Sequence, residues 1–307
     1  MTRGRPTGAT EPLPGLRPGA LPVAVRTRFA PAPTGFLHLG HVANALFVWG
    51  VARATGARVL LRIEDHDRQR CRPEYAAALL RDLDALGLVA DEGPVRQSDD
   101  PGPYLEALER LEVAGVAYAC DCSRSTFAAW AAAHGRSWSG PGCPGRCRGR
   151  GLEPLTGRAI RIALGDATER WDDLRLGPSE GPVAPSGDMP ARDRHGNWSY
   201  GFAVVVDDLR QGVDLVVRGE DLAPATPDQL GLARLLGRTE APRFLHHPLI
   251  RKPGGAKLSK ADGDAAIGAR LAAGATPEAL FGEAAAAVGL TTSPLPVSLD
   301  EIAARLR

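Results

Sequence analysis

The sequence predicts an α/β protein built on a parallel sheet, and three observations support this fold class. Short apolar runs typical of buried strands alternate with segments of helical apolar spacing, as in residues 23–30, 41–55, 58–63 and 73–86. The first predicted strand runs through a Pro/Gly turn, residues 31–40, directly into a helix. The 307 residues suffice for about two domains with a stable apolar core. Strands and helices in this order indicate βαβ units, whose strands pair in parallel.

Composition excludes several classes of protein. The formal net charge is +1 and 44% of residues are hydrophobic, which argues against a histone-like or polybasic binder. No apolar run approaches the ~18 residues of a membrane span. Residues 1–24 are rich in Pro, Gly and Arg without an apolar core, so they predict a disordered extension and no secretory signal. Five cysteines without such a signal favour a reducing, cytoplasmic location and free or metal-bound thiols.

The remaining elements suggest a catalytic domain interrupted by an insertion. We expect its two halves at residues 25–99 and 196–245, an inserted α+β subdomain at 100–195, and a lysine loop with short helices at 246–307. Within the insertion we expect a helix at 125–133, a strand at 158–164 and a loop at 177–194. Later elements are expected as strands at 202–206 and 213–217, and as helices at 226–236, 265–273, 277–288 and 299–306.

The turn after the first strand has features of a phosphate site. Gly35 and Gly40 let the backbone approach a ligand closely, and the helix N-terminus supplies N–H groups and a positive dipole end. His38 and His41, three residues apart, can donate hydrogen bonds to phosphate oxygens. Alone, this segment fits a Pro-rich turn with two surface histidines equally well.

The three lysines of the chain are clustered, although the protein has 37 basic residues. Lys252, Lys257 and Lys260 fall within nine residues, and the latter two flank Leu258-Ser259 in a loop that follows two glycines. A compact, mobile ammonium suits a triphosphate whose charge redistributes during a reaction. The alternative is a chance cluster in a basic loop.

Together these two segments resemble the signatures of class I aminoacyl-tRNA synthetases. His38-Leu39-Gly40-His41 resembles the HIGH motif and Lys257-Leu258-Ser259-Lys260 the KMSKS motif. The resemblance implies a Rossmann-like nucleotide-binding domain of the HUP type. Stretches similar to the glutamyl branch of this family are residues 28–35, 62–67, 200–208 and 216–222.

The resemblance also implies roles for individual residues. The residues expected to bind glutamate are Arg28, Phe29, Ala30, Pro31, Ala32, Glu64, Tyr200 and Arg218. Those expected to bind ATP are His38, Gly40, His41, Glu220 and Lys260, and the catalytic groups would be His38, His41, Lys257 and Lys260. Two arginine forks can each hold a carboxylate bidentately, and Glu64 can accept from an ammonium. Ala32 replaces the family serine, which removes one side-chain hydrogen bond.

Four cysteines form a candidate metal site. Cys120-x-Cys122 and Cys143-x3-Cys147 lie in a Gly/Pro-rich stretch that is too small for an apolar core of its own, and four thiolates can close a tetrahedral, structural Zn²⁺ site. Two disulfides or four unrelated thiols are the alternatives. Nearby arginines suggest an RNA phosphate surface, with an ordinary solvated face as the alternative; they are Arg124, Arg136, Arg146, Arg148 and Arg150.

About 47 residues follow Lys260, whereas full glutamyl-tRNA synthetases continue with a large anticodon-binding region. The chain therefore resembles the truncated glutamyl-queuosine tRNA(Asp) synthetases. This resemblance implies activation of L-glutamate by ATP with Mg²⁺, without tRNA, and transfer to the queuosine at the wobble position of tRNA(Asp). Alternatives are a minimal glutamyl-tRNA synthetase that charges an acceptor end, and a zinc-dependent RNA-binding module with a decayed ATP site. No protein partner is indicated.

Overall fold

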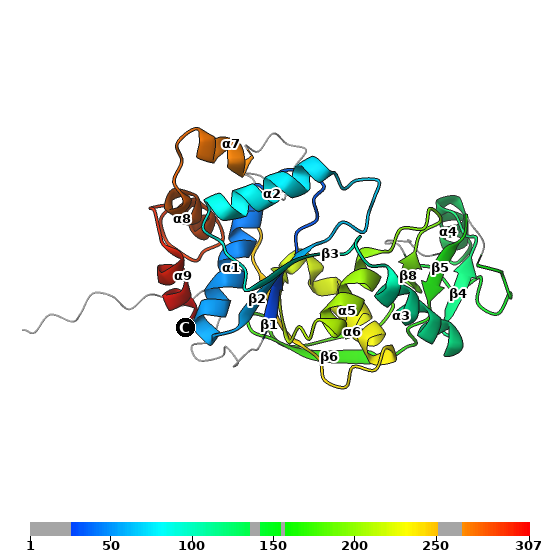
Figure 1. Cartoon of the computed structure of the whole chain (residues 1–307). Coiled ribbons are helices and arrows are strands. Elements are labelled where there is room, and N and C mark those ends of the chain that lie inside the picture. The colour runs from blue at the N-terminus through cyan, green and yellow to red at the C-terminus, as the bar shows by residue number, and fades with distance from the viewer. Residues whose placement is uncertain (1–25, 136–141, 155–156, 251–265) are drawn as a thin grey trace, which may run out of the picture.

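The computed structural model describes residues 26–135, 142–154, 157–250 and 266–307 (Figure 1). The expected N-terminal extension and the loop that carries Lys257 and Lys260 lie outside these residues. Among the described helices, none combines the length and apolar character needed to cross a bilayer.

The body of the protein is a mainly parallel sheet in two adjoining parts. One part has the strand order β1–β2–β3 and the other β7–β6–β10–β9, with β7 as the antiparallel edge. The parts adjoin where the N–H of Asp214 donates to the carbonyl of Arg26, 3.2 Å away. These strands are β1 (Arg26–Phe29), β2 (Arg58–Ile63), β3 (Glu92–Arg96), β6 (Thr168–Asp173), β7 (Gly177–Pro182), β9 (Leu215–Gly219) and β10 (Arg243–His247).

Helices connect the parallel strands in the manner of a nucleotide-binding fold. The helix α1 (Leu39–Thr55) links β1 to β2, and α2 (Pro73–Ala85) links β2 to β3. A 3₁₀ turn (Glu220–Ala225) and α6 (Thr226–Leu235) link β9 to β10. The direction in which successive strands are added to the sheet reverses between β1 and β9. Ligands of open α/β sheets bind at such a switch point, at the carboxyl ends of the strands.

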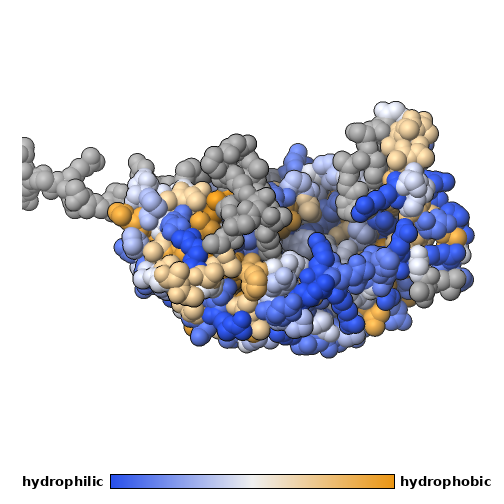
Figure 2. Space-filling view, turned by 90° about the horizontal axis from the view of Figure 1, so that it is seen from above, coloured by the Kyte–Doolittle hydropathy of each residue, from blue (hydrophilic) through white to orange (hydrophobic). Residues whose placement is uncertain are grey.

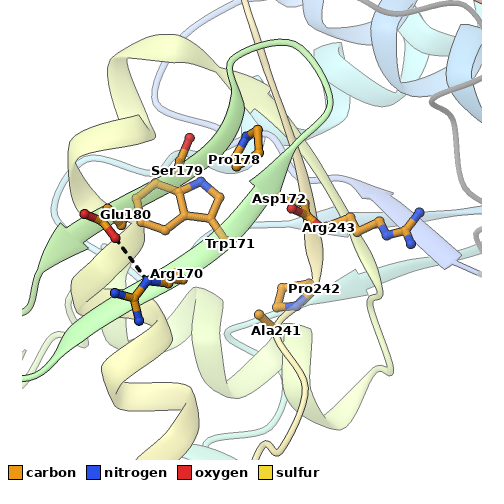
Figure 3. A pocket seen from close by; sticks show the side chains of 9 residues that line it. All are labelled: Arg170, Trp171, Asp172, Pro178, Ser179, Glu180, Ala241, Pro242 and Arg243. Carbon is orange, nitrogen blue, oxygen red and sulfur yellow. Dashed lines mark hydrogen bonds and ion pairs between the residues drawn. The ribbon is translucent and has the colours of Figure 1, made fainter.

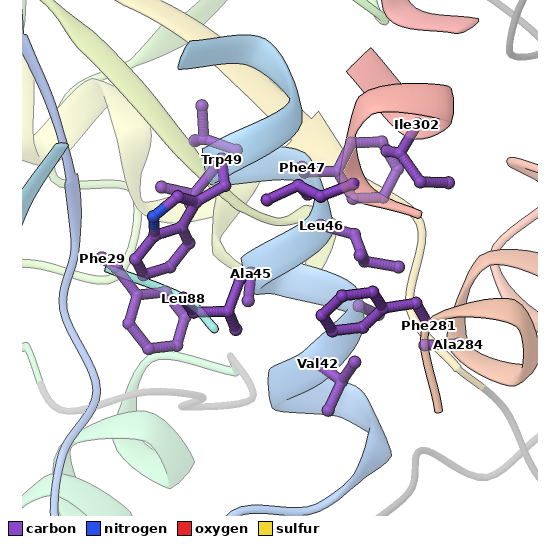
Figure 4. Packing of buried hydrophobic residues seen from close by; sticks show 14 of the residues in the cluster. Phe29, Val42, Ala45, Leu46, Phe47, Trp49, Leu88, Phe281, Ala284 and Ile302 are labelled. Carbon is purple, nitrogen blue, oxygen red and sulfur yellow. The ribbon is translucent and has the colours of Figure 1, made fainter. Parts of the chain in front are cut away.

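One sheet face and α1 enclose the main apolar core. Phe29, Leu61 and Val217 belong to this core, and the Phe29 ring lies 5.1 Å from that of Trp49 on α1 (Figure 4). The other side of α1 packs on two C-terminal helices, where Gly50 approaches α9 so closely that a Cβ would lie 2.7 Å from a Leu306 methyl. The C-terminal helices are α7 (Ile267–Ala272), α8 (Pro277–Ala287) and α9 (Leu299–Leu306).

The opposite face of the sheet carries buried charged side chains. Side chains alternate along a strand, so the neighbours of the core residues point to this face. Arg28, Arg62 and Arg218 occupy this face, and they are 4%, 0% and 4% exposed. It is covered by α5 (Tyr200–Arg210) and α6. Helix α5 supplies the carboxylates that this face requires.

The predicted strand at 202–206 is wrong, since these residues lie within α5. Residues 202–206 are all apolar and buried, and an apolar run of this length does not distinguish a strand from a buried helix. The missed signal is Ser199, whose hydroxyl accepts from the N–H of Phe202 as an N-cap.

The insertion contributes to the catalytic sheet as well as forming its own subdomain. Residues 177–194 are not a loop, because they include β7 and β8 (Met189–Arg192). Strand β6 pairs in parallel with β10, and β7 is an edge strand, where proline is tolerated. The subdomain proper projects from the sheet (Figure 1) and comprises α3 (Gly102–Val113), β4 (Ala117–Cys120), α4 (Arg124–Ala133), β5 (Ala159–Ile162) and β8 (Met189–Arg192).

Candidate active site

The histidine turn caps α1 with its own imidazoles. The N–H of Gly40 donates to Nδ1 of His38, and the N–H of His38 donates to Nδ1 of His41, each at 3.1 Å. With both Nδ1 atoms accepting, the proton of each neutral ring lies on Nε2, which makes Nε2 the donor. A Cβ on Gly40 would lie 2.9 Å from Cε1 of His38, so only glycine allows this ring to fold over the helix start.

Asp208 holds two of the buried arginines. Its carboxylate accepts from Nε of Arg28 at 3.1 Å and from Nη1 of Arg62 at 2.8 Å. Nη1 of Arg28 also donates to the carbonyl of Val217. These bonds use two of the five N–H groups of Arg28, so the remaining three suffice for a two-pronged contact with a carboxylate.

Glu64 and Tyr200 adjoin these arginines. Arg62 donates to Glu64 at 3.1 Å, and the N–H of Glu64 donates to the carbonyl of Pro31, which ties the end of β2 to the turn after β1. Burial raises the pKa of Glu64, although Arg62 and Arg28 oppose the shift. Burial also raises the pKa of Tyr200. The charge of Glu64 raises this pKa further, whereas the charges of Arg218 and Arg28 lower it. Of the residues expected to bind glutamate, Arg28, Glu64, Tyr200 and Arg218 therefore lie around one site.

Arg218 is a buried cation held by neutral partners. Nε donates to Nε2 of His246 at 2.9 Å and Nη1 to Gln229 at 2.6 Å, while Nη2 donates to Thr226 at 2.7 Å and to the carbonyl of Leu222 at 3.4 Å. No carboxylate of the described residues forms an ion pair with it. An unpaired charge in this position is costly, which favours an anionic ligand.

Arg218 differs from expectation in one respect. Four of its five N–H groups donate to His246, Gln229, Thr226 and Leu222, and Tyr200 is a further side-chain partner, so no bidentate fork is left for a ligand.

Three other residues expected to bind glutamate or ATP make contacts within the protein. Glu220, expected to contact a ribose, accepts from Arg175 at 2.5 Å at the start of the turn after β9. The side chain of Phe29 lies in the apolar core, so only its backbone can face a ligand (Figure 4). Ala32 accepts from the N–H of Thr34 through its carbonyl.

Several residues that the sequence did not single out support the site. Asp207 is fully buried and accepts from Tyr104 on α3 at 2.9 Å and from Gln97 at 2.7 Å. Gln97 in turn contacts Nδ1 of His66 at 2.6 Å, which gives His66 a place in this network. The pair Asp207-Asp208 was visible as part of a motif, but its partners come from elements far apart in the chain.

The four predicted metal ligands gather in the projecting subdomain. Sγ atoms of Cys120, Cys122 and Cys147 all lie within 4.8 Å of one another, and Sγ of Cys143 lies 3.8 Å from that of Cys120. All four are buried, whereas Cys71 lies elsewhere, with its Sγ 3.7 Å from the carbonyl of Glu64.

Two arginines near this cluster are already paired. Arg148 binds the buried Asp188, and Arg150 binds Asp121 at 3.1 Å, so their charges are partly neutralised. Arg136 lies outside the described residues. Hydrophilic side chains nevertheless dominate the half of the face in Figure 2 that includes this subdomain.

A separate pocket of about 530 Å³ lies at the other end of the strands. Figure 3 shows Trp171 of β6 against Pro178 and Ser179 of β7, with Arg243 at the start of β10. Arg218 and His246 lie near the carboxyl ends of β9 and β10, whereas this pocket is lined by Ala241, Pro242 and Arg243 at the amino end of β10. It is not part of the candidate active site.

Comparisons with known proteins agree with this geometry. The family model "tRNA synthetases class I (E and Q), catalytic domain" matches residues 24–134 and 187–293. A protein of Symbiobacterium thermophilum named Glutamyl-Q tRNA(Asp) synthetase is 42% identical over 90% of this chain and 90% of its own length. One of the same name from Cupriavidus metallidurans is 44% identical, covering 80% of this chain and 79% of its own.

Longer synthetases are also similar. A "Glutamate--tRNA ligase" of Synechococcus is 39% identical over 84% of this chain but 56% of its own length. The solved glutamate tRNA ligase of Elizabethkingia meningosepticum superposes with a TM-score of 0.75 and 28% identity, and the match covers 91% of this chain and 64% of that one. The fold is thus that of a class I synthetase. The chain belongs to the class I tRNA synthetases for glutamate and glutamine, and within them to the glutamyl-Q tRNA(Asp) synthetase family.

Proposed function

We propose that this protein activates L-glutamate with ATP, without tRNA, and then transfers the glutamyl group to the queuosine at the wobble position of tRNA(Asp). The observation that carries the proposal is the site of the buried Arg28, Glu64 and Arg218 with the half-buried Tyr200, in which Arg218 has no carboxylate partner among the described residues. A glutamate ligand supplies two carboxylates and one ammonium, and therefore complements the two arginines and Glu64.

The chemistry needs positioning more than acid–base catalysis. A carboxylate oxygen of glutamate attacks the α-phosphorus of ATP, and pyrophosphate leaves with the electron pair of the broken P–O bond. Nε2–H groups of His38 and His41, at the N-terminus of α1, would stabilise the phosphoryl charge that develops. Lys257 and Lys260 would act on the same charge, Gly40 would allow close approach, and Glu220 would accept from the ribose. Mg²⁺ would accompany ATP.

A pyrophosphate exchange assay tests the first step. We expect exchange that depends on glutamate and does not require tRNA, followed by transfer to tRNA(Asp) that carries queuosine but not to tRNA(Asp) without it. Transfer to tRNA(Glu) would instead support a minimal glutamyl-tRNA synthetase, an alternative favoured by the Synechococcus ligase. Absence of any exchange would contradict both.

We further propose that the four cysteines hold one structural Zn²⁺. Sulfurs about 2.3 Å from a tetrahedral zinc lie about 3.8 Å apart, and the Cys120–Cys143 and Cys122–Cys147 pairs are 3.8 and 3.6 Å apart. The metal would supply folding energy to a subdomain whose own core is small. Metal analysis should find one Zn²⁺ per chain, lost in Cys143→Ser and kept in Cys71→Ser. Equal metal content in both variants would argue against Cys143 as a ligand. A cytoplasmic location stays a prediction.

A further inference from the structure

A buried carboxylate stands behind the imidazole that holds Arg218. Nδ1 of His246 lies 2.5 Å from Oδ2 of Asp173, and both side chains are completely buried. On the other side of the same ring, Nε2 accepts from Nε of Arg218 at 2.9 Å. Asp173 ends β6, His246 lies on β10 and Arg218 on β9, so the chain of contacts crosses three adjacent strands.

The contacts fix the tautomer of His246. The Asp173 carboxylate can only accept a hydrogen bond, so the ring proton lies on Nδ1 of His246 and Nε2 is an acceptor. Burial lowers the pKa of His246, although the hydrogen bond to Asp173 opposes this shift. Burial tends to raise the pKa of Asp173, but the hydrogen bonds from His246 and from the N–H groups of Leu176 and Arg175 outweigh it and lower that pKa. The imidazole is therefore neutral and the carboxylate charged.

A neutral spacer has a different effect on Arg218 from that of a direct carboxylate partner. It accepts one N–H and fixes the guanidinium plane, and Arg218 also stacks over the ring of Phe244, 5.2 Å away. Phe244 in turn is parallel to the His246 ring. The guanidinium is thus held by hydrogen bonds and by the Phe244 ring without an ion pair, so its charge is not neutralised within the protein.

We propose that Asp173 and His246 are positioning residues that orient Arg218 without neutralising it, and so make the amino-acid site selective for a carboxylate over a carboxamide. The proposal rests on the proposed function, because it assumes that the ligand of Arg218 is glutamate. Both residues would act through Arg218 and not by contact with the ligand. The charged groups that face His246 are Asp173 at the end of β6, Arg175 in the turn after β6, and Arg218 from β9.

Asp173→Asn changes the tautomer of His246, and it also removes the bond that Oδ2 accepts from the backbone N–H of His246 at 3.3 Å, so the tautomer itself is read by NMR. Oδ1 of Asp173 accepts the N–H groups of Arg175 and Leu176, and asparagine keeps that oxygen and hence the turn after β6. Its amide nitrogen would face Nδ1 of His246 as a donor. The ring would then carry its proton on Nε2, donor against donor with Arg218.

A matched pair at His246 separates orientation from packing. In His246→Gln the amide group occupies the position of Nε2 and can present its oxygen to Arg218. In His246→Asn the shorter amide reaches only the position of Nδ1. A purely structural role would make both variants equally defective, whereas the proposal requires glutamine to rescue and asparagine to fail.

The assay is tRNA-independent pyrophosphate exchange with glutamate and, in parallel, glutamine. For Asp173→Asn and His246→Asn we expect the KM for glutamate to rise about 10- to 100-fold, which equals about 1.4–2.8 kcal/mol at 1.4 kcal/mol per tenfold. We expect kcat to change less, the preference for glutamate over glutamine to shrink, and His246→Gln to stay within about threefold of wild type. Equal KM increases in the two His246 variants, or an unchanged KM in Asp173→Asn, would overturn the proposal.

A direct readout does not depend on catalysis. Nitrogen-15 NMR of the His246 ring should show the Nδ1–H tautomer in the wild-type protein and the Nε2–H tautomer in Asp173→Asn. An Nε2–H ring in the wild type would overturn the positioning role even in an active enzyme. A wild-type Nδ1–H ring in a protein without glutamate-dependent exchange would contradict the proposed function and leave the positioning role standing.

Discussion

Replacing Asp208 by asparagine should destabilise the protein more than any other single-atom change on the charged sheet face. The carboxylate serves Arg28 and Arg62 at once, and both guanidinium groups are almost fully buried. Loss of one member of a buried ion pair costs about 3–5 kcal/mol. Because asparagine keeps one oxygen and Arg62 keeps its bond to Glu64, we expect a loss at the lower end of this range, about 3 kcal/mol, which falls mainly on Arg28. This is a large part of the roughly 5–15 kcal/mol that stabilises a typical domain.

The pH dependence follows from the sign of the shift. Burial tends to raise the pKa of Asp208, but Arg28 and Arg62 outweigh it and lower that pKa. The stabilisation by this carboxylate is therefore complete above the unfolded-state pKa of about 3.9 and is lost as the pH falls through the lower folded-state value. The difference between wild type and Asp208→Asn should shrink only in that acidic range.

Urea unfolding monitored by tryptophan fluorescence measures the effect. Asp228→Asn is the matched control, because Asp228 also lies on a helix but accepts a single bond, from the N–H of Ala184 at 2.6 Å, and burial raises its pKa. Asparagine keeps that bond, so we expect a change below about 1 kcal/mol. Losses of similar size in Asp208→Asn and Asp228→Asn would refute the reasoning that the two arginines depend on Asp208.

Four further predictions concern the site and its support. Gly40→Ala should displace the His38 ring and lower the rate of glutamate activation by at least about tenfold, while changing stability by only about 0.5–2 kcal/mol, the value of one helix cap. Gly50→Val should lower the free energy of unfolding by about 1–3 kcal/mol, since α1 and α9 have no room for the side chain. Burial raises the pKa of Glu64, and a protonated Glu64 no longer attracts the ammonium of glutamate. The KM for glutamate should therefore rise as the pH falls toward this raised pKa, and Glu64→Gln should abolish the dependence. Lys260→Arg should slow activation although it keeps the charge.

Each of these predictions has a clear contrary outcome. Wild-type exchange rates in Gly40→Ala or Lys260→Arg would remove the mechanistic argument for that residue. Unchanged urea midpoints in Gly50→Val would mean that α9 does not pack as described. A KM in Glu64→Gln that still rises with acid would assign the titration to another group.

Local signals predicted most elements because their physical cause is local. The proline at the start of α2 and the apolar spacing of α1 marked both helices, and β2 has the bounds predicted for it, residues 58–63. Helix α5 and strands β6 and β7 were missed or misassigned, since their form depends on neighbours. An all-apolar run becomes a helix here because α5 is enclosed by the sheet and the subdomain.

The sequence by itself determined which chemical groups the site contains. The histidine turn, the arginines at strand ends and the four cysteines are recognisable from residue types and spacing, because capping, side-chain alternation and ligand spacing act over a few residues. Only the tertiary structure decided which charges meet: Asp208 with Arg28 and Arg62, and Asp173 with His246 and Arg218. Arg218 and His246 are 28 positions apart in the sequence, and Arg28 and Asp208 are 180 positions apart. Burial makes such pairings obligatory, but the fold alone determines which residues are buried together.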